Sequence, residues 1–174
     1  MKWITRQDIR VNRTATCWLI RRFIDPEADF VFAPPDQIAA MQVAQDAIGF
    51  DAPGATYPHT NAQGLCSFAA LVHERLGHDP VLLEMARIVQ AADIQGQLDD
   101  DPAARGLQTI SHGFPLVTKD DYETVERASF VYDALYASIM EGQAQNRIAH
   151  RVRRRKRDWK LEYGSAGNSG DAHW

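Results

Sequence analysis

One helical segment near the start of the 174-residue chain constrains the fold most, because it carries a charge where a core residue is expected. Read at about 100° per residue, residues 13–24 place apolar side chains along one face, so the pattern predicts a three-turn helix. That face holds Thr16, Leu19, Ile20, Phe23 and Ile24, and Arg13 falls among them. Asp25-Pro26 ends the segment, since the residue before a proline is pushed out of helical geometry.

Arg13 restricts what can lie beside this helix, because an arginine cannot lose its proton in a protein and needs a carboxylate or an anion next to it. Cys17 and Arg21 follow Arg13 at four-residue steps along the edge of the same face. Guanidinium forks suit tetrahedral oxygens, so we predict that Arg13 and Arg21 bind a small oxyanion. These positive neighbours would also lower the pKa of the Cys17 thiol, although a small core residue is the simpler interpretation.

A second misplaced charge, Asp93, lies on the apolar face of a later helix that Asp79-Pro80 begins. The apolar members of this face are Leu82, Met85, Ala86, Val89 and Ala92. An isolated buried carboxylate costs several kcal/mol unless it is paired or bound to a metal. Either Arg13 and Asp93 form one buried ion pair, or both line a polar pocket that a ligand or a metal ion enters.

A group of ligand-type residues lies between these two helices. Asp51 ends a short predicted strand, His59 lies in the long loop of residues 52–63, and Cys66 opens a helix together with Ser67. Asp, His and Cys all bind divalent transition metals, so Asp51, His59, Cys66 and Asp93 form a predicted metal site. The helix dipole would stabilise a Cys66 thiolate, which makes Cys66 the candidate catalytic residue. The spacing matches neither CxxC nor HExxH, so a capping Asp, a surface His and a small buried Cys are the plain alternative.

The order of the predicted elements indicates an α+β fold. Short strands are predicted at residues 3–5, 29–33 and 48–51, with helices between them, and the chain after residue 64 is predicted to be helical. We expect a small, partly parallel, three-stranded sheet packed with four to five α-helices.

Charge divides the chain into an acidic body and a basic tail. Residues 147–160 hold eight of the 19 Lys and Arg residues and one of the 23 acids, which leaves 11 basic and 22 acidic residues elsewhere. We therefore predict a globular domain at residues 1–142 and a basic, flexible tail at 143–174. An acidic body does not wrap nucleic acid, but residues 147–160 resemble a patch that contacts nucleic acid or an acidic protein weakly. A solvated extension is the alternative.

The cysteine count and the hydropathy pattern indicate the cellular compartment in which the protein is expected. Two cysteines are too few for a disulfide scaffold, so we expect free thiols in a reducing cytoplasm. No stretch approaches the roughly 20 apolar residues of a membrane helix, and the first residues do not resemble a signal peptide. The expectation is a soluble, cytoplasmic protein without membrane contact.

Several blocks of the sequence together form one recognisable pattern. The first block is Lys2–Arg6, then Arg13, Trp18–Ala28, Phe32 and Pro34-Pro35-Asp36. The later matches are Phe50-Asp51, Pro53-Gly54, His59, Cys66-Ser67-Phe68, Ala92-Asp93 and Val131–Tyr136. This pattern resembles the bacterial chromate-resistance protein family, whose domain forms the C-terminal part of the regulator that accompanies the chromate efflux pump and also occurs alone. The resemblance covers residues 2–140.

The resemblance implies a link to chromate resistance, and Arg13, Asp51, His59, Cys66 and Asp93 all match positions of the family pattern. The family commonly has Cys-Pro before the Trp, where this sequence has Thr16-Cys17. The thiol therefore stands one position later, which argues against a role that needs it at a fixed place. The regulator version adds an N-terminal DNA-binding region, which we expect this chain to lack.

These observations predict a chromate-resistance-related protein with a polar pocket that binds a metal ion or a small oxyanion. The first rival hypothesis is a thiol- or metal-dependent reductase or hydrolase that uses Cys66 or Cys17. The second is a regulatory interaction module without a small ligand, in which Arg13 and Asp93 simply pair.

Overall fold

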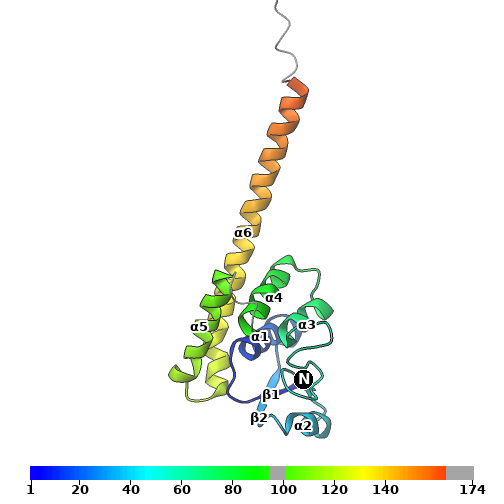
Figure 1. The fold of residues 1–174 in the computed structure, drawn as a ribbon, viewed down its shortest axis with the longest axis vertical. Helices are drawn as coiled ribbons and strands as arrows, with labels where there is room; N and C mark the ends of the chain where they lie inside the picture. The colour runs from blue at the N-terminus through cyan, green and yellow to red at the C-terminus, as the bar shows by residue number, and fades with distance from the viewer. Residues whose placement is uncertain (95–100, 164–174) are drawn as a thin grey trace, which may run out of the picture. The chain divides into compact units, whose positions relative to one another are not determined.

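The computed structural model describes residues 1–94 and 101–163, with side chains as far as Arg154 (Figure 1). The chain divides into two compact units, residues 1–137 and the residues from 138 onward, which are described separately. The first unit contains the sheet, five helices and the start of the sixth.

Three parallel strands form the sheet in the order β2-β1-β3. They are β1 (Lys2–Arg6), β2 (Asp29–Ala33) and β3 (Ile48–Gly49). Along β1 and β2, Lys2 lies opposite Asp29 and Arg6 opposite Ala33. The central residues of β1 are fully buried, as expected for a parallel strand covered on both faces. The predicted three-stranded sheet is confirmed, and every pairing within it is parallel.

The central helix differs from its prediction in the last turn. α1 (Val11–Leu19) continues into a π-helical turn, η1 (Ile20–Ile24), which the 2.7 Å bond from Asp25 N to Ile20 O closes. The wider turn lets Phe23 pack on Trp18 five residues earlier, with ring centroids 5.5 Å apart. The prediction of a regular three-turn α-helix was therefore wrong beyond Leu19, and Phe23 is 37% exposed rather than part of a buried face.

The other helices are α2 (Ile38–Ala44), α3 (Ser67–Arg75), α4 (Pro80–Asp93), α5 (Pro102–Val117) and α6 (Asp121–Tyr163). α4 and α5 begin at the predicted Asp-Pro signals. The Asp79 carboxylate accepts from the backbone N–H groups of Val81 and Leu82, and Asp101 caps α5 in the same way. The described residues thus hold six α-helices, one more than the largest predicted number, in the expected α+β class.

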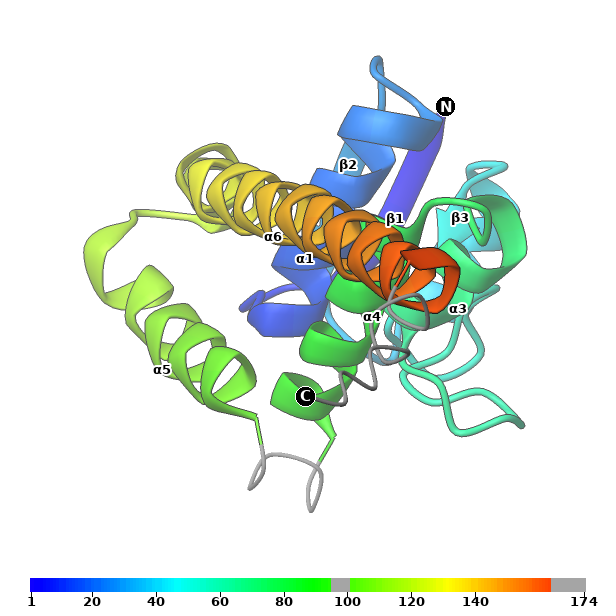
Figure 2. The same ribbon diagram turned by 90° about the horizontal axis from the view of Figure 1, so that it is seen from above.

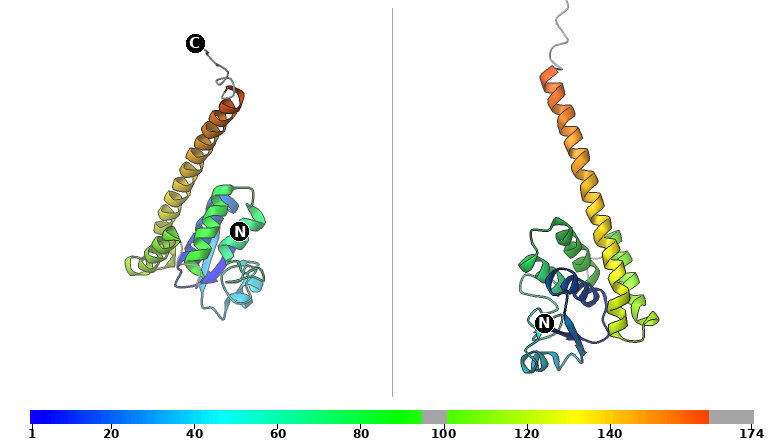
Figure 3. Two further views of the ribbon diagram at one scale, coloured as in Figure 1. Left: turned by 45° about the horizontal axis from the view of Figure 1, so that its top comes forward. Right: turned by 180° about the vertical axis from the view of Figure 1, so that it is seen from behind.

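The core of the first unit forms around α1, which packs against α3, α4 and α5. Figures 2 and 3 show α3 and α4 side by side next to α1. The largest fully buried side chains include Trp3, Trp18, Phe50, Phe68 and Tyr132. On the other face of the sheet, Ile4 and Ile38 form a smaller apolar cluster beneath α2. This packing fixes the ends of β1 and β3 close to the start of α1.

The second unit is the continuation of α6, which runs unbroken past Gly142 to Tyr163. The predicted tail of residues 143–174 is therefore helical as far as the structure describes it, and residues 164–174 lie outside the described part. The boundary at residue 142 stays a prediction. None of the helices in the described part of the chain is both long and apolar enough to cross a membrane.

Candidate functional site

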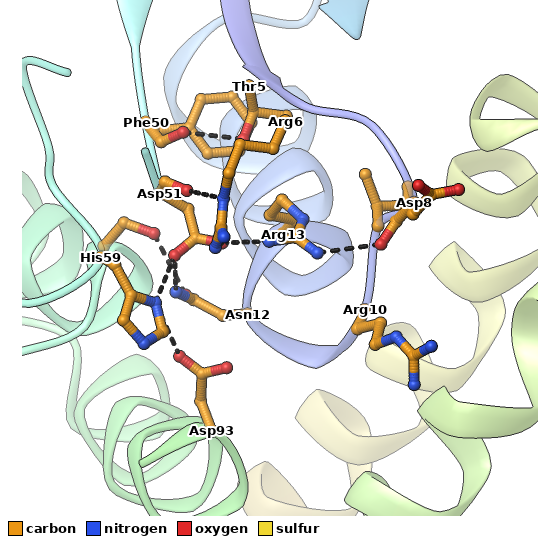
Figure 4. Close-up of polar contacts among 12 residues, drawn as sticks. Thr5, Arg6, Asp8, Arg10, Asn12, Arg13, Phe50, Asp51, His59 and Asp93 are labelled. Carbon is orange, nitrogen blue, oxygen red and sulfur yellow. Dashed lines mark hydrogen bonds and ion pairs between the residues drawn. The ribbon is translucent and has the colours of Figure 1, made fainter. Parts of the chain in front are cut away.

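The candidate site is built around Asp51, which follows β3 at the carboxyl end of the parallel sheet. Asp51 has a φ of 50°, in the left-handed region that Asp tolerates better than most residues. Its N–H donates to the Tyr57 carbonyl at 2.7 Å, and the residue is 1% exposed. The turn sends the carboxylate into the protein rather than into solvent, toward the first turn of α1 (Figure 4).

Four side chains donate to the Asp51 carboxylate. Oδ2 accepts from Arg13 Nη1 at 2.7 Å and from Arg6 Nη2 at 3.0 Å. Oδ1 accepts from Asn12 Nδ2 at 3.0 Å and contacts His59 Nδ1 at 2.6 Å. Burial alone would raise the pKa of Asp51, but the His59 hydrogen bond and the charges of Arg13 and Arg6 hold it below its usual value. Asp51 is therefore ionised at neutral pH, and both of its carboxylate oxygens accept hydrogen bonds.

Asn12 connects this carboxylate to a second helix. The Asn12 side chain is buried, and its Oδ1 accepts from Ser67 Oγ at 3.1 Å and from the Phe68 N–H at 3.2 Å. A side chain of α1 thus satisfies an N–H in the first turn of α3, a group that has no partner within its own helix. Asn12 holds Asp51 and α3 in a fixed relation.

His59 lies between two carboxylates at the outer edge of the site, with its side chain 47% exposed. Its Nδ1 is 2.6 Å from Asp51 Oδ1 and 3.6 Å from Asp93 Oδ2. The hydrogen bond to Asp51 is the main cause that raises the pKa of His59, with further contributions from the charges of Asp51 and Asp93. Its other ring nitrogen, Nε2, makes no hydrogen bond to the described residues.

Asp93 is the last residue of α4, and its side chain is only 15% exposed. Oδ2 of Asp93 is buried and has no hydrogen-bond partner within the described ranges. Burial and the nearby Asp51 charge raise the pKa of Asp93 to about 6. At neutral pH this carboxylate is largely ionised, and its Oδ2 has no hydrogen-bond donor among the described residues, with the His59 ring 3.6 Å away as the nearest partner of opposite charge.

Asp51, His59 and Asp93 each offer one ligand atom, and these atoms lie within 4.8 Å of one another. Two carboxylate oxygens and one imidazole nitrogen are a donor set that suits divalent first-row transition metals. Arg6, Arg13 and Asn12 would then hold the Asp51 carboxylate from behind, as the hydrogen-bonding partners of metal ligands do. Three protein ligands leave coordination positions for water or a substrate.

Comparison with known proteins gives the family. The family model described as "ChrB, C-terminal domain" matches residues 3–139. The chain belongs to the ChrB family. Protein ChrB of Cupriavidus metallidurans is 32% identical over 136 residues, which are 78% of this chain and 40% of that relative's length. No solved structure matches the chain. The resemblance to the chromate-resistance family is thereby confirmed.

In this ChrB-family chain the structure brings together four predicted site residues, Arg13, Asp51, His59 and Asp93. The alternative prediction of a direct Arg13–Asp93 ion pair is wrong, because Arg13 donates to the Asp51 carboxylate and, at 2.8 Å, to the Asp8 carbonyl. Helical periodicity placed both charges on buried faces but could not show that the left-handed turn at Asp51 would bring a third charge to Arg13.

Arg21 lies two helical turns beyond Arg13 and takes part in different contacts. Its guanidinium pairs with Glu126 and lies over the Phe30 ring, 4.9 Å from the ring centroid. The structure therefore does not place Arg21 beside Arg13 at the Asp51 cluster.

Both thiols are buried in the protein. Cys66 is buried at the start of α3, and burial raises its pKa to about 12 despite the N–H groups of Ala69 and Phe68. Burial also raises the pKa of Cys17, and this outweighs the charges of Arg21 and Arg13. The expected stabilisation of both thiolates was wrong, since desolvation exceeds the effects of the dipole and the arginines. The Cys66 sulfur also lies outside the group of ligand atoms.

Two residues of the site were not predicted from the sequence, Arg6 and Asn12. Arg6 is the last residue of β1, and Asp51 follows β3, so both lie at the carboxyl ends of parallel strands. Ligands of open parallel sheets bind at these ends, and the position of Arg6 at the end of a predicted strand could therefore have indicated its place in the site. Asn12 precedes Arg13 by one residue, and nothing in its sequence context distinguishes it from a surface asparagine.

Proposed function

We propose that this ChrB-family domain acts in chromate resistance by binding a divalent first-row transition-metal ion through Asp51, His59 and Asp93. The observation that carries the proposal is the buried Oδ2 of Asp93, which has no hydrogen-bond partner among the described residues and faces His59 at 3.6 Å. A buried carboxylate is stable beside a cation or when protonated, and a metal ion replaces the proton.

The charges of the site favour a cation over the small oxyanion of the sequence-based hypothesis. Asp51 pairs with both Arg6 and Arg13 and compensates one of their two charges, while Asp93 supplies a second negative charge that pairs with neither arginine. Asp93 stands at the C-terminal end of α4, where the helix dipole favours positive charge. One donor argues the other way, because Arg13 Nε is buried without a partner in the described residues. An oxyanion is therefore tested alongside the metal.

The burial of Cys66 and Cys17 argues against the thiol-dependent reductase or hydrolase. A catalytic thiol must be accessible and ionise near neutral pH, and both sulfurs are buried with raised pKa values. The contacts of Asp51 also differ from those of a closed structural pair, since Asp93 is left out of them.

The test is metal binding by purified protein that a chelator has stripped. Titration with Co²⁺, Ni²⁺, Zn²⁺ and Mn²⁺, followed by elemental analysis, is expected to give one ion per chain for at least one metal. We expect His59→Ala and Asp93→Asn each to weaken binding by roughly tenfold or more, since each removes one of three ligands. Asp133→Asn is the matched control, because Asp133 pairs with Arg22 away from the cluster.

Two results would overturn the proposal. One is wild-type metal affinity in both ligand variants while all chains remain folded by circular dichroism. The other is saturable binding of chromate or molybdate by the metal-free chain that Asp93→Asn leaves unchanged and Arg13→Lys abolishes. That second result would identify an oxyanion site at Arg13.

A further inference from the structure

The second compact unit, taken by itself, exposes a dense row of basic side chains on one helix. Arg147, His150, Arg151, Arg153 and Arg154 of α6 are all exposed. At 100° per residue, Arg147, His150, Arg151 and Arg154 share one face. Among the described residues, neither Arg151 nor Arg153 makes a hydrogen bond or an ion pair.

The linear charge density of this segment is close to that of a nucleic-acid duplex. Residues 147–157 contain seven Lys and Arg residues and no acid. At a rise of about 1.5 Å per residue this is one positive charge per about 2.4 Å of helix. Duplex DNA carries one negative charge per about 1.7 Å of its axis. We propose that α6 from Arg147 onward binds the phosphate backbone of double-stranded DNA without reading its sequence.

The arginines on this helix face repel one another, and bound DNA would remove that repulsion. Arg147 and Arg151 are four residues apart, and Arg151 and Arg154 are three apart, so each pair repels across one turn. A polyanion along this face removes the repulsion, and counterions released from the duplex favour binding further. DNA should therefore stabilise the helical conformation of this segment against unfolding.

The dimensions favour DNA over the other polyanions. An α-helix with its side chains is about 10–12 Å across, which matches the roughly 12 Å width of the DNA major groove. The major groove of A-form RNA is too narrow and deep for a helix. A membrane-surface helix needs a broad apolar face, and between Arg147 and Arg154 the exposed large apolar side chains are Ile148 and Val152.

The experiment uses the whole chain and a fluorescein-labelled DNA duplex of mixed sequence, with anisotropy measured over a range of salt concentrations. The variant Arg151→Gln/Arg153→Gln/Arg154→Gln removes three exposed cations. We expect it to weaken binding by roughly tenfold or more, and to reduce the slope of log affinity against log salt by up to about 3. Thermal unfolding of the helix, followed by circular dichroism, should shift to higher temperature when DNA is added to wild type, and should shift less in this variant.

The matched control is Arg105→Gln/Lys119→Gln/Arg127→Gln, which removes three exposed cations from residues 1–137. It should bind DNA as wild type does, and so should Asp93→Asn, because the inference does not depend on the metal site. Equal losses in the tail and control variants would overturn the proposal. Tighter binding to duplex RNA, to polyglutamate or to phosphatidylglycerol vesicles than to DNA would also overturn it.

Discussion

At the scale of single residues, Asp93 is the ionisable group of the site whose pKa is raised by burial and by a like charge. The pKa of Asp93 is raised to about 6, chiefly by burial, whereas an unfolded Asp titrates near about 3.9. Between these values the folded chain keeps a proton that the unfolded chain has lost. The stabilising contribution of protonated Asp93 is therefore complete below about pH 4 and is lost as pH rises through 6.

Asp93→Asn should remove this pH dependence from the metal-free protein. The difference in unfolding free energy between variant and wild type should grow in favour of the variant by up to about 3 kcal/mol between pH 4 and pH 7.5. Urea unfolding at several pH values measures it. Asp133→Asn is expected to give the opposite sign, because Arg22 holds the pKa of Asp133 below its usual value. A pH-independent difference for Asp93→Asn would show that its carboxylate is solvated.

The two cysteines give a second prediction at this scale. Both are buried, and the pKa of Cys66 is about 12, so neither forms appreciable thiolate at neutral pH. A disulfide reagent such as dithionitrobenzoate should react with neither thiol in the folded chain, and with both after guanidinium unfolding. One thiol that reacts within seconds in the native protein would contradict the burial and reopen the thiol-enzyme hypothesis.

Between elements, Asn12 connects three parts of the site through its side-chain amide. Its amide donates to Asp51 and accepts from the first turn of α3, so it couples α1, α3 and the turn after β3. Asn12→Leu leaves the Phe68 N–H without this acceptor and removes one donor from Asp51. Each buried group left unsatisfied costs about 1–3 kcal/mol.

We therefore expect Asn12→Leu to reduce the unfolding free energy by about 2–4 kcal/mol and to weaken metal binding about 10–100-fold. Denaturant unfolding and calorimetric metal titration of the folded variant measure the two effects. Ser111→Ala is a suitable control, because Ser111 is also fully buried, and its hydroxyl donates to the Gln108 carbonyl within α5 rather than to another element of the described chain. It should lose some stability and keep the wild-type metal affinity. Equal metal affinity in Asn12→Leu would mean that Asn12 is structural only.

Elements with local sequence signals could be predicted, whereas features that depend on tertiary contacts could not. Asp79-Pro80 and Asp101-Pro102 predicted two helix starts because capping is local, and the short strands followed from local apolar runs. The π-helical turn that begins at Ile20 was not predicted, because it goes with the packing of Phe23 on Trp18, a contact that the apolar periodicity does not indicate. Arg13 and Asp93 were identified as charges on apolar helix faces. The partner of Arg13 could not be identified, because it depends on the left-handed backbone conformation of Asp51, and helical periodicity contains no information about that conformation.

For the whole molecule, the two proposals fall on different parts of the chain. The metal-site residues all lie within residues 1–137, a compact unit that contains most of the segment matched by the family model, residues 3–139. The basic helix lies in residues 147–160, whose positive charge contrasts with the acidic composition of the rest. If both proposals hold, the chain joins a metal-binding domain to a DNA-binding segment, and the two activities should be separable.

A chain that ends at Asn146 tests this separation. It keeps every side chain that the structure shows in contact with Asp51, His59 or Asp93, so we expect the metal affinity and the pH dependence of unfolding to equal those of the full chain. It lacks all seven basic residues of 147–157, so DNA binding at physiological salt should fall below detection, as counterion release requires. Calorimetry and anisotropy on the same preparations measure both. Loss of metal binding in a folded shortened chain would show that the C-terminal helix supports the site, and the two activities would then have to be treated as coupled.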